Sequence, residues 1–150
     1  MSSLFPYVVR RVEWRDACNE LRAVRTQVFV DEQKVPVELE WDDMDQVSTH
    51  VLAHSSEGEP IGTGRLLPDG HIGRMAVVQG WRRRGVGSGL LRELMRMAHE
   101  AGFTEVRLNA QTDAVPFYAS HGFLAEGPVF LDAGIAHRYM RCALRAPASR

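Results

Sequence analysis

The sequence predicts an α+β domain with a mixed, mostly antiparallel sheet. Three observations support this fold class: stretches rich in β-branched residues open and close the chain, two segments carry apolar residues at helical spacing, and three short strands joined by turns lie between them. A strand, helix and strand in succession also predict one parallel pair.

The first third of the chain predicts a strand, a helix and an irregular segment. Tyr7–Trp14 ("YVVRRVEW") predicts the first strand. An apolar face at helical spacing predicts a helix between Asp16 and Val30. The acidic segment 31–46 has no clean period and contains Pro36, so we expect a long loop or a broken helix, of the kind that tends to be functional or disordered.

The middle of the chain predicts an antiparallel meander followed by a strong helix. Residues 49–55, 60–67 and 71–78 are short strands separated by turn residues. Residues 86–101 carry an apolar stripe, and Gly102 stands where a helix usually ends.

The last third predicts further strands around a short helix. Residues 104–110 predict a strand, 113–121 a short helix ending at Gly122, and 123–128 and 136–144 two late strands. The unit from Ile72 to Leu108 is then a strand–helix–strand crossover, whose strands should be parallel and right-handed.

Composition places the chain among single globular domains, here residues 1–150. The 18 basic and 19 acidic residues give a net charge of −1, which argues against a general nucleic-acid binder. Cys18 and Cys142 show no metal spacing and predict free thiols in a reducing compartment. Without a signal peptide or a long apolar run, the sequence predicts a cytoplasmic protein that does not bind membranes.

The stretch "WRRRGVGSG" (Trp81–Gly89) predicts an anion site. It lies between a strand and a helix, so its amides form the first helical turn, where N–H groups lack partners and the helix dipole favours negative charge. Its glycines allow close approach of a phosphate. A solvated turn with exposed arginines is the alternative. The patterns GxxxxGK[ST] and GxGxxG are both absent.

Two motifs carry a family resemblance. "VVQGWRRRGVGSGLL" resembles the acetyl-coenzyme-A loop of the GNAT superfamily of N-acetyltransferases, with Arg82, Gly85 and Gly87 at the motif positions. "AVPFYASHGF" resembles the second family block, a helix with Tyr118 followed by Gly-Phe at 122–123. The resemblance is firmest over residues 70–123.

The resemblance implies one GNAT domain, with a central sheet splayed at the cofactor site and about four flanking helices. The stretch "LRAVRTQVFVDEQKVPVELEWDDMD" is similar to the ElaA-like bacterial branch. Family members often dimerise through their sheets, so the resemblance is compatible with a homodimer.

The resemblance also implies acetyl-CoA as co-substrate. The pyrophosphate would lie on the amides of Arg84 to Ser88, and the pantetheine arm would extend along Met75, Ala76 and Val77, which requires the parallel strands to part after Val77. Gln111 replaces an Asn that often contacts pantetheine. The implied coenzyme-binding residues are Met75, Ala76, Val77, Arg82, Arg83, Arg84, Gly85, Val86, Gly87, Ser88, Gln111 and Phe117.

We expect no metal. His50 and His54 are four residues apart on a predicted strand, about 13 Å, which is too far to share an ion.

Acyl transfer to an amine needs an acid and a base. Tyr118 stands at the family's general-acid position, where a phenol can protonate the departing thiolate. An alkylamine is mostly protonated at neutral pH, so a base must accept its proton. Many relatives carry a Glu on the strand before the loop, and this chain does not. The candidates left open are His71, Glu40, Asp45 and His137.

The leading hypothesis is an acetyl-CoA-dependent N-acetyltransferase in which a primary amine attacks the thioester directly. The acceptor, a small-molecule or peptide amine, is not identified, and a longer acyl group stays open. The acidic residues at 38–45 either attract a cationic amine or form a solvated surface. Two alternatives are a non-catalytic acyl-CoA sensor and nucleic-acid binding through Arg82, Arg83 and Arg84.

Overall fold

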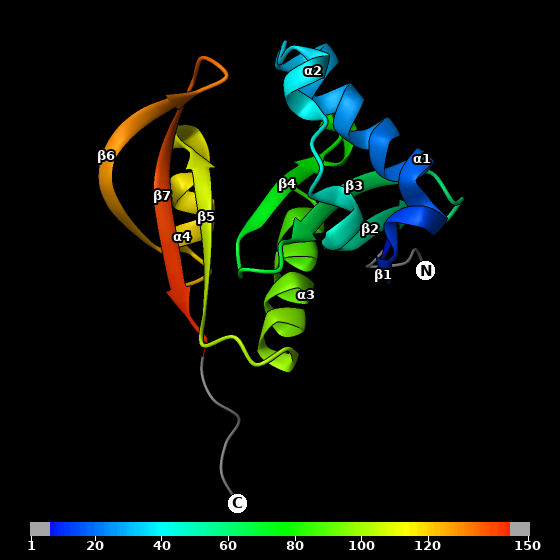
Figure 1. Ribbon diagram of the computed structural model, residues 1–150. Coiled ribbons are helices and arrows are strands. Elements are labelled where there is room, and N and C mark those ends of the chain that lie inside the picture. The colour runs from blue at the N-terminus through cyan, green and yellow to red at the C-terminus, as the bar shows by residue number, and fades with distance from the viewer. Residues whose placement is uncertain (1–6, 145–150) are drawn as a thin grey trace, which may run out of the picture.

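The structure is a computed structural model and describes residues 7–144, in which seven strands form two sheets (Figure 1). The first sheet has the order β1-β2-β3-β4 and is antiparallel throughout. The second has the order β5-β7-β6 and is also antiparallel. The strands are β1 (Tyr7–Val12), β2 (Thr49–Ser55), β3 (Pro60–Leu66), β4 (Ile72–Val77), β5 (Glu105–Gln111), β6 (Leu124–Asp132) and β7 (Ile135–Ala143).

The two sheets meet at β4 and β5 and then diverge, as Figure 1 shows. A single parallel bridge, His71 to Arg107, joins them. The predicted parallel pair therefore has the expected direction, but the strands part before Met75, and the expectation that they part after Val77 is wrong. A bulge in β4 contributes to this, since the β3–β4 register shifts opposite Arg74, whose φ is 49°.

The helices differ in detail from the prediction. α1 (Trp14–Arg25) starts earlier than expected and runs into a π-helical segment, η1 (Thr26–Glu32). The segment after it is a broken helix, as predicted: α2 (Val37–Glu40) and the 3-10 turn η2 (Asp45–Val47). The remaining helices are η3 (Gln79–Trp81), α3 (Val86–Glu100), η4 (Thr112–Ala114) and α4 (Val115–Ala119).

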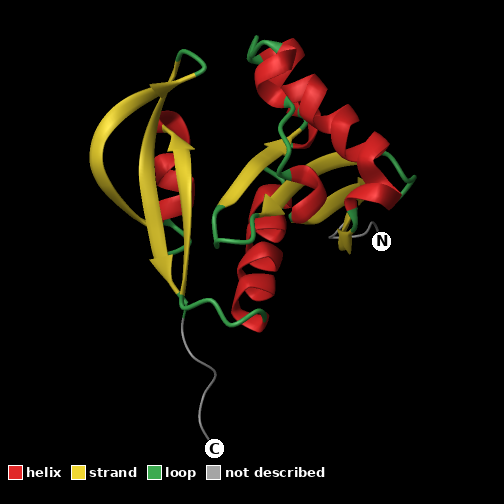
Figure 2. Cartoon of the chain, viewed as in Figure 1, coloured by secondary structure: helices red, strands yellow, loops and turns green. Residues whose placement is uncertain are grey.

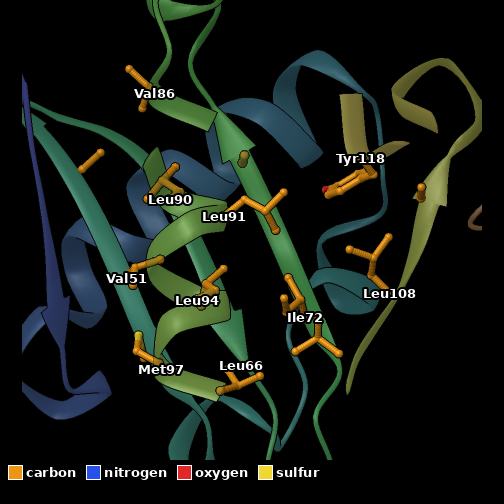
Figure 3. Packing of buried hydrophobic residues seen from close by; sticks show 14 of the residues in the cluster. Val51, Leu66, Ile72, Val86, Leu90, Leu91, Leu94, Met97, Leu108 and Tyr118 are labelled. Carbon is orange, nitrogen blue, oxygen red and sulfur yellow. The ribbon is translucent and has the colours of Figure 1, made fainter. Parts of the chain in front are cut away.

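Helices α1 and α3 cover opposite faces of the first sheet (Figure 2). In β2, Leu52 packs on the α1 residues Ala17 and Leu21, whereas its neighbour Val51 belongs to the main core. Figure 3 shows Val51 beside Leu94 of α3. Successive strand residues point to opposite faces, so this sheet is buried on both sides.

Two glycines of β3 let α3 approach the sheet closely. A Cβ at Gly62 would lie 2.8 Å from a methyl of Leu90, and one at Gly64 would lie 2.7 Å from a methyl of Leu94. The close contact fixes α3 against β3, and with it the loop that precedes α3.

Helix α4 packs on the second sheet through Tyr118, which belongs to the same core as Leu108 of β5. The late strands are longer than predicted, because β6 continues through Gly127 and Pro128 to Asp132. Within residues 7–144, no helix is both long and apolar enough to cross a bilayer.

Candidate active site

A cavity of about 460 Å³ lies where the sheets diverge. Its size is typical of small-molecule sites. Elements from both halves line it: β4 and the η1–α2 segment on one side, β5, β7 and α4 on the other. The site residues predicted from sequence that line this cavity are Glu40, His71, Met75, Gln111, Tyr118 and His137.

The glycine loop leads into the N-terminus of α3, as predicted. Gly85 is the N-cap residue with φ 85°, a conformation that favours glycine, and no side chain of residues 7–144 caps the helix. The amides of Val86, Gly87 and Ser88 have no acceptor within residues 7–144. A Cβ at Gly87 would lie 3.4 Å from the ring of Phe117. These open amides fit a phosphate group.

Two of the three arginines before Gly85, Arg82 and Arg84, make different contacts. Arg82 donates from Nε to the Val77 carbonyl at 2.8 Å and forms a two-bond ion pair with Glu32, which lowers the pKa of that carboxyl. The Arg84 guanidinium lies 4.7 Å from the Trp81 ring centre. Arg82 thus ties β4 to η1, and its contact with coenzyme stays a prediction.

Within residues 7–144, the edge of β4 that faces β5 pairs with no strand beyond the bridge at His71. On the other edge, Ala76 is paired with Thr63 and the Val78 amide donates to Ile61. Met75 lines the cavity. A free strand edge can pair with an extended amide-containing ligand.

Tyr118 reaches into the gap between the sheets. Figure 3 shows its ring extending from α4 toward β4. Burial raises its pKa to about 12, and its hydroxyl has no hydrogen-bond partner in the described part of the chain. The phenol is therefore protonated at neutral pH and free to donate a hydrogen bond.

His137 lies on the other face of the second sheet. It pairs with Gln111 of β5, and directly opposed residues of an antiparallel pair share a face. The buried β5 residues Leu108 and Ala110, on the α4 side, point the opposite way by strand alternation. Tyr118 and His137 therefore line one cavity from opposite faces of β5.

A backbone contact fixes the tautomer of His137. Its Nδ1 lies 2.7 Å from the Ile135 carbonyl oxygen, which can only accept, so Nδ1 carries the hydrogen. In the neutral ring, Nε2 then keeps its lone pair. The ring also stacks on Phe130, with centres 5.9 Å apart.

Glu40 and Asp45 belong to a buried ion-pair cluster with Arg25, Arg65 and Asp42. Arg25 donates to Glu40 at 2.7 Å and to Asp45 at 2.8 Å. Burial raises the pKa of Glu40, against the pull of Arg25 and Arg74. Asp45 does not line the cavity, and its two oxygens accept from Arg25 and Arg65, so it is wrong as a candidate base.

Arg65 and Arg25 also explain the lowered pKa values of the aspartates. Hydrogen bonds from Arg65 lower the pKa of Asp42 to about 2. Burial of Asp45 would raise its pKa, but bonds from Arg25 and Arg65 outweigh it and lower the value. Glu40, Asp42 and Asp45 of the predicted acidic run are thus neutralised by arginines, although Asp42 itself is exposed.

His71 lines the cavity and is paired with Asp69, with Nδ1 2.9 Å from the carboxylate. His50 is a structural residue: it is buried, its Nε2 lies 2.8 Å from the Asp45 carbonyl oxygen, and burial lowers its pKa. Within residues 7–144, no three His, Cys, Asp or Glu side chains come together as a metal site.

Sequence reasoning missed several residues of the site. Gln33 of the η1–α2 segment accepts from Gln111 at 2.8 Å, and Asn109 lines the same cavity. The contact of His121 Nε2 with the hydroxyl of Ser88, a predicted coenzyme-binding residue, was also missed; it spans 3.0 Å and links the glycine loop to the end of α4. The sequence held one sign that Arg25 is buried: it lies four residues after Leu21, on the apolar face of α1.

Comparisons with known proteins agree with this geometry. The family model for the acetyltransferase (GNAT) domain matches residues 16–144. An uncharacterised N-acetyltransferase of Bacillus subtilis, YjcF, is 41% identical over 121 residues, covering 78% of this chain and 86% of that protein.

Two solved structures share the fold at higher than 25% identity. An acyl-CoA N-acyltransferase from Pseudomonas aeruginosa is 31% identical with a TM-score of 0.81, covering 91% of this chain and 99% of that one. Escherichia coli ElaA is 26% identical with a TM-score of 0.80 and the same coverage of each chain. Together with the open helix N-terminus and the splayed sheets, these matches show that this chain belongs to the GNAT family of acetyltransferases.

Proposed function

We propose that this protein transfers an acetyl group from acetyl-CoA to the primary amine of a small molecule or peptide, by direct attack of the amine on the thioester. The observation that carries the proposal is the cavity between the sheets, which Tyr118 and His137 line from opposite faces of β5. Direct transfer needs a base near the attacking amine and an acid near the departing sulfur, and these two side chains can approach a thioester in the cavity from different directions.

The coenzyme side of the site is formed by α3 and β4. The amides at the start of α3 would bind the pyrophosphate, and the free edge of β4 would hold the pantetheine arm beside Met75. Bound acetyl-CoA supplies the activated acyl group. A backbone N–H near Val77 would stabilise the negative charge that develops on the thioester oxygen.

His137 would accept a proton from the amine, and Tyr118 would donate one to the thiolate. The lone pair on His137 Nε2 can accept the proton that the amine loses, while the Nδ1–H···O contact to Ile135 holds the ring in place. Burial keeps the Tyr118 phenol protonated, so its O–H is present to donate a hydrogen bond to the departing thiolate and to protonate it. Glu40 is a poorer base than His137, because both of its oxygens contact arginines.

The test is amine-dependent release of coenzyme thiol. The protein is incubated with acetyl-CoA and a panel of primary amines and short peptides; thiol release is followed with a thiol reagent, and the N-acetyl product by mass spectrometry. Tyr118→Phe should lower kcat about 100-fold or more while leaving acetyl-CoA affinity by calorimetry nearly unchanged. Tyr139→Phe is the control, because Tyr139 lies on β7 and does not line the cavity.

The acyl-CoA sensor is the alternative to be excluded. A sensor would bind acetyl-CoA, release no thiol with any amine, and be indifferent to Tyr118→Phe. The structure weakens the case for nucleic-acid binding. Arg82 is paired with Glu32 and Arg84 lies over Trp81, so both arginines already have partners within the protein.

A further inference from the structure

Arg74 has a backbone conformation that strands rarely tolerate. Its φ of 49° lies in the left-handed region, which is costly for a residue other than glycine. The Thr63 hydroxyl donates to the Arg74 carbonyl at 3.1 Å and helps to hold this bulge. Strain of this kind collects at functional sites, and Arg74 lines the cavity.

Only one of the three nitrogens of the Arg74 guanidinium donates a hydrogen bond of good geometry within residues 7–144. Nη2 donates to the Glu40 carbonyl at 3.1 Å and to Asp42 at 3.2 Å. Nε lies 3.1 Å from a Glu40 oxygen, but it is buried and makes no hydrogen bond of good geometry. Nη1 has no partner within residues 7–144, and the side chain is 27% exposed.

The acids around Arg74 are already neutralised. The carboxylates of Glu40, Asp42 and Asp45 are matched by the guanidinium groups of Arg25, Arg65 and Arg74. The acidic residues that line the cavity are Glu40, which is in this cluster, and Asp132, which is exposed near the β6–β7 turn. An acceptor with a second positive charge would therefore meet little compensating charge.

The other polar groups on this side suit an anion. Gln33, Asn109 and Gln111 line the cavity; the two glutamines bond to each other, and each of the three amide nitrogens keeps an N–H that can donate to an anion. Apolar side chains complete the wall: Phe29, Val35, Leu39, Ile72 and Ile135.

We propose that the acceptor is an amine that carries a carboxylate and an apolar side chain, and that Arg74 Nη1 binds the carboxylate. The proposal rests on the proposed function and names the substrate class of the same site. Because Glu40 and Asp42 already match the charge of Arg74, Nη1 offers open N–H donors without surplus charge, which fits a single carboxylate better than a doubly charged phosphate.

The first experiment compares matched amines on the wild-type protein. Leucine and phenylalanine are each paired with the amine that lacks the carboxylate, 3-methylbutylamine and 2-phenylethylamine, and O-phosphoethanolamine is paired with ethanolamine. Product formation is divided by the concentration of neutral amine, since the carboxylate changes the pKa of the amine. We expect the carboxylate to raise kcat/KM at least tenfold in both apolar pairs.

The outcomes distinguish failure of the carboxylate proposal from failure of the acetyltransferase proposal. If the amines without a carboxylate are acetylated equally well, the acetyltransferase proposal stands and the carboxylate proposal is wrong. Preference for O-phosphoethanolamine over the amino acids also overturns it, in favour of a phosphate-bearing acceptor. If no amine is acetylated, the proposed function fails and the acceptor proposal fails with it.

The second experiment tests whether Arg74 binds the carboxylate of the acceptor or only supports the structure of the site. Arg74→Met should raise KM for the carboxylate-bearing acceptor about 10- to 100-fold, the usual effect of a charge-assisted hydrogen bond, and leave KM for its decarboxylated partner and for acetyl-CoA unchanged. Arg74→Lys should recover part of the loss. Arg96→Met is the control, because Arg96 pairs with Glu93 on the surface of α3. An equal rise in KM for both amines would show a merely structural role and contradict the proposal.

Discussion

At the scale of single residues, His137 shows how a backbone contact selects the chemistry of a side chain. The carbonyl of Ile135 accepts a hydrogen bond from Nδ1–H and leaves Nε2 as the basic nitrogen. Phe130 stacks on the same ring and restricts its rotation. A histidine held in one tautomer and one orientation can act as a base without first reorganising.

His137→Ala should therefore lower kcat about 100-fold or more at pH 7. The loss should shrink as the pH is raised toward 10, because a larger share of the amine is then neutral without help. Added imidazole should restore part of the rate at pH 7. These measurements need steady-state kinetics over the pH range, with acetyl-CoA affinity as the control. A loss that is equal at all pH values would contradict a role as base and leave Glu40 and His71 as the candidates.

Individual residues were predictable where their role depends on local sequence, and not where it depends on distant partners. Tyr118 and Gly85 sit in motifs whose neighbours define a helix and a helix start, and both lie where predicted. Asp45 was mistaken for a candidate base because its partners, Arg25 and Arg65, are 20 residues away on either side. Arg82 was similarly unpredictable, since Glu32 is 50 residues from it.

At the scale of elements, the segment from η1 to η2 is held by ion pairs rather than by helical propensity. α2 has four residues and η2 three, too few to be stable alone. Glu40 ends α2, Asp45 begins η2, and both bind Arg25 of α1. The cluster thus fixes the wall of the cavity that carries Leu39 and Glu40.

Asp42→Asn should lower the free energy of unfolding by about 1 kcal/mol at pH 7, because Asn keeps one acceptor oxygen for Arg65 but loses the second acceptor and the charge, at a partly exposed site. The pKa of Asp42 in the folded protein, about 2, is below its ordinary value of 3.8. The stabilisation is therefore present above pH 4 and is lost as the pH falls toward 2.

Denaturant unfolding of wild type and Asp42→Asn at pH 7, 5 and 2.5 measures this dependence. Asp43→Asn is the control, since Asp43 is exposed and has no ion-pair partner in the described part of the chain. If wild type and Asp42→Asn differ in stability by the same amount at pH 2.5 as at pH 7, the ionised carboxylate of Asp42 is not the source of the stabilisation.

Element order was readable from the sequence because it depends on local periodicity and turn residues. The meander β2–β3–β4, the apolar stripe of α3 and the turns at Gly102 and Gly122 all follow from residues close in the chain. The π-helical η1 and the bulge at Arg74 could not be read in this way. Both depend on contacts across the cavity, such as the pair Gln33–Gln111 and the approach of Arg74 to Glu40.

At the scale of the whole molecule, the two sheets are joined mainly at one end. The bridge from His71 to Arg107 and the bond from the Arg107 amide to the Gly70 carbonyl, at 3.2 Å, lie where β4 and β5 begin to diverge. Beyond that point each strand has an edge that faces the cavity. A ligand that pairs with β4 and contacts Tyr118 would join the two halves.

Acetyl-CoA should therefore slow amide hydrogen exchange in segments on both sides of the cavity. We expect the protection over residues 72–80, the start of α3 and residues 105–113, with little change in β1, whose partner is β2. Gly87→Glu supplies the control: a side chain there points at Phe117 and places a carboxylate at the open amides, so acetyl-CoA should give no protection. Protection confined to the start of α3 would mean that the ligand binds by its phosphates alone and does not bridge the sheets. Protection that persists in Gly87→Glu would place the phosphate site elsewhere, because a negative charge at these amides should exclude a second one.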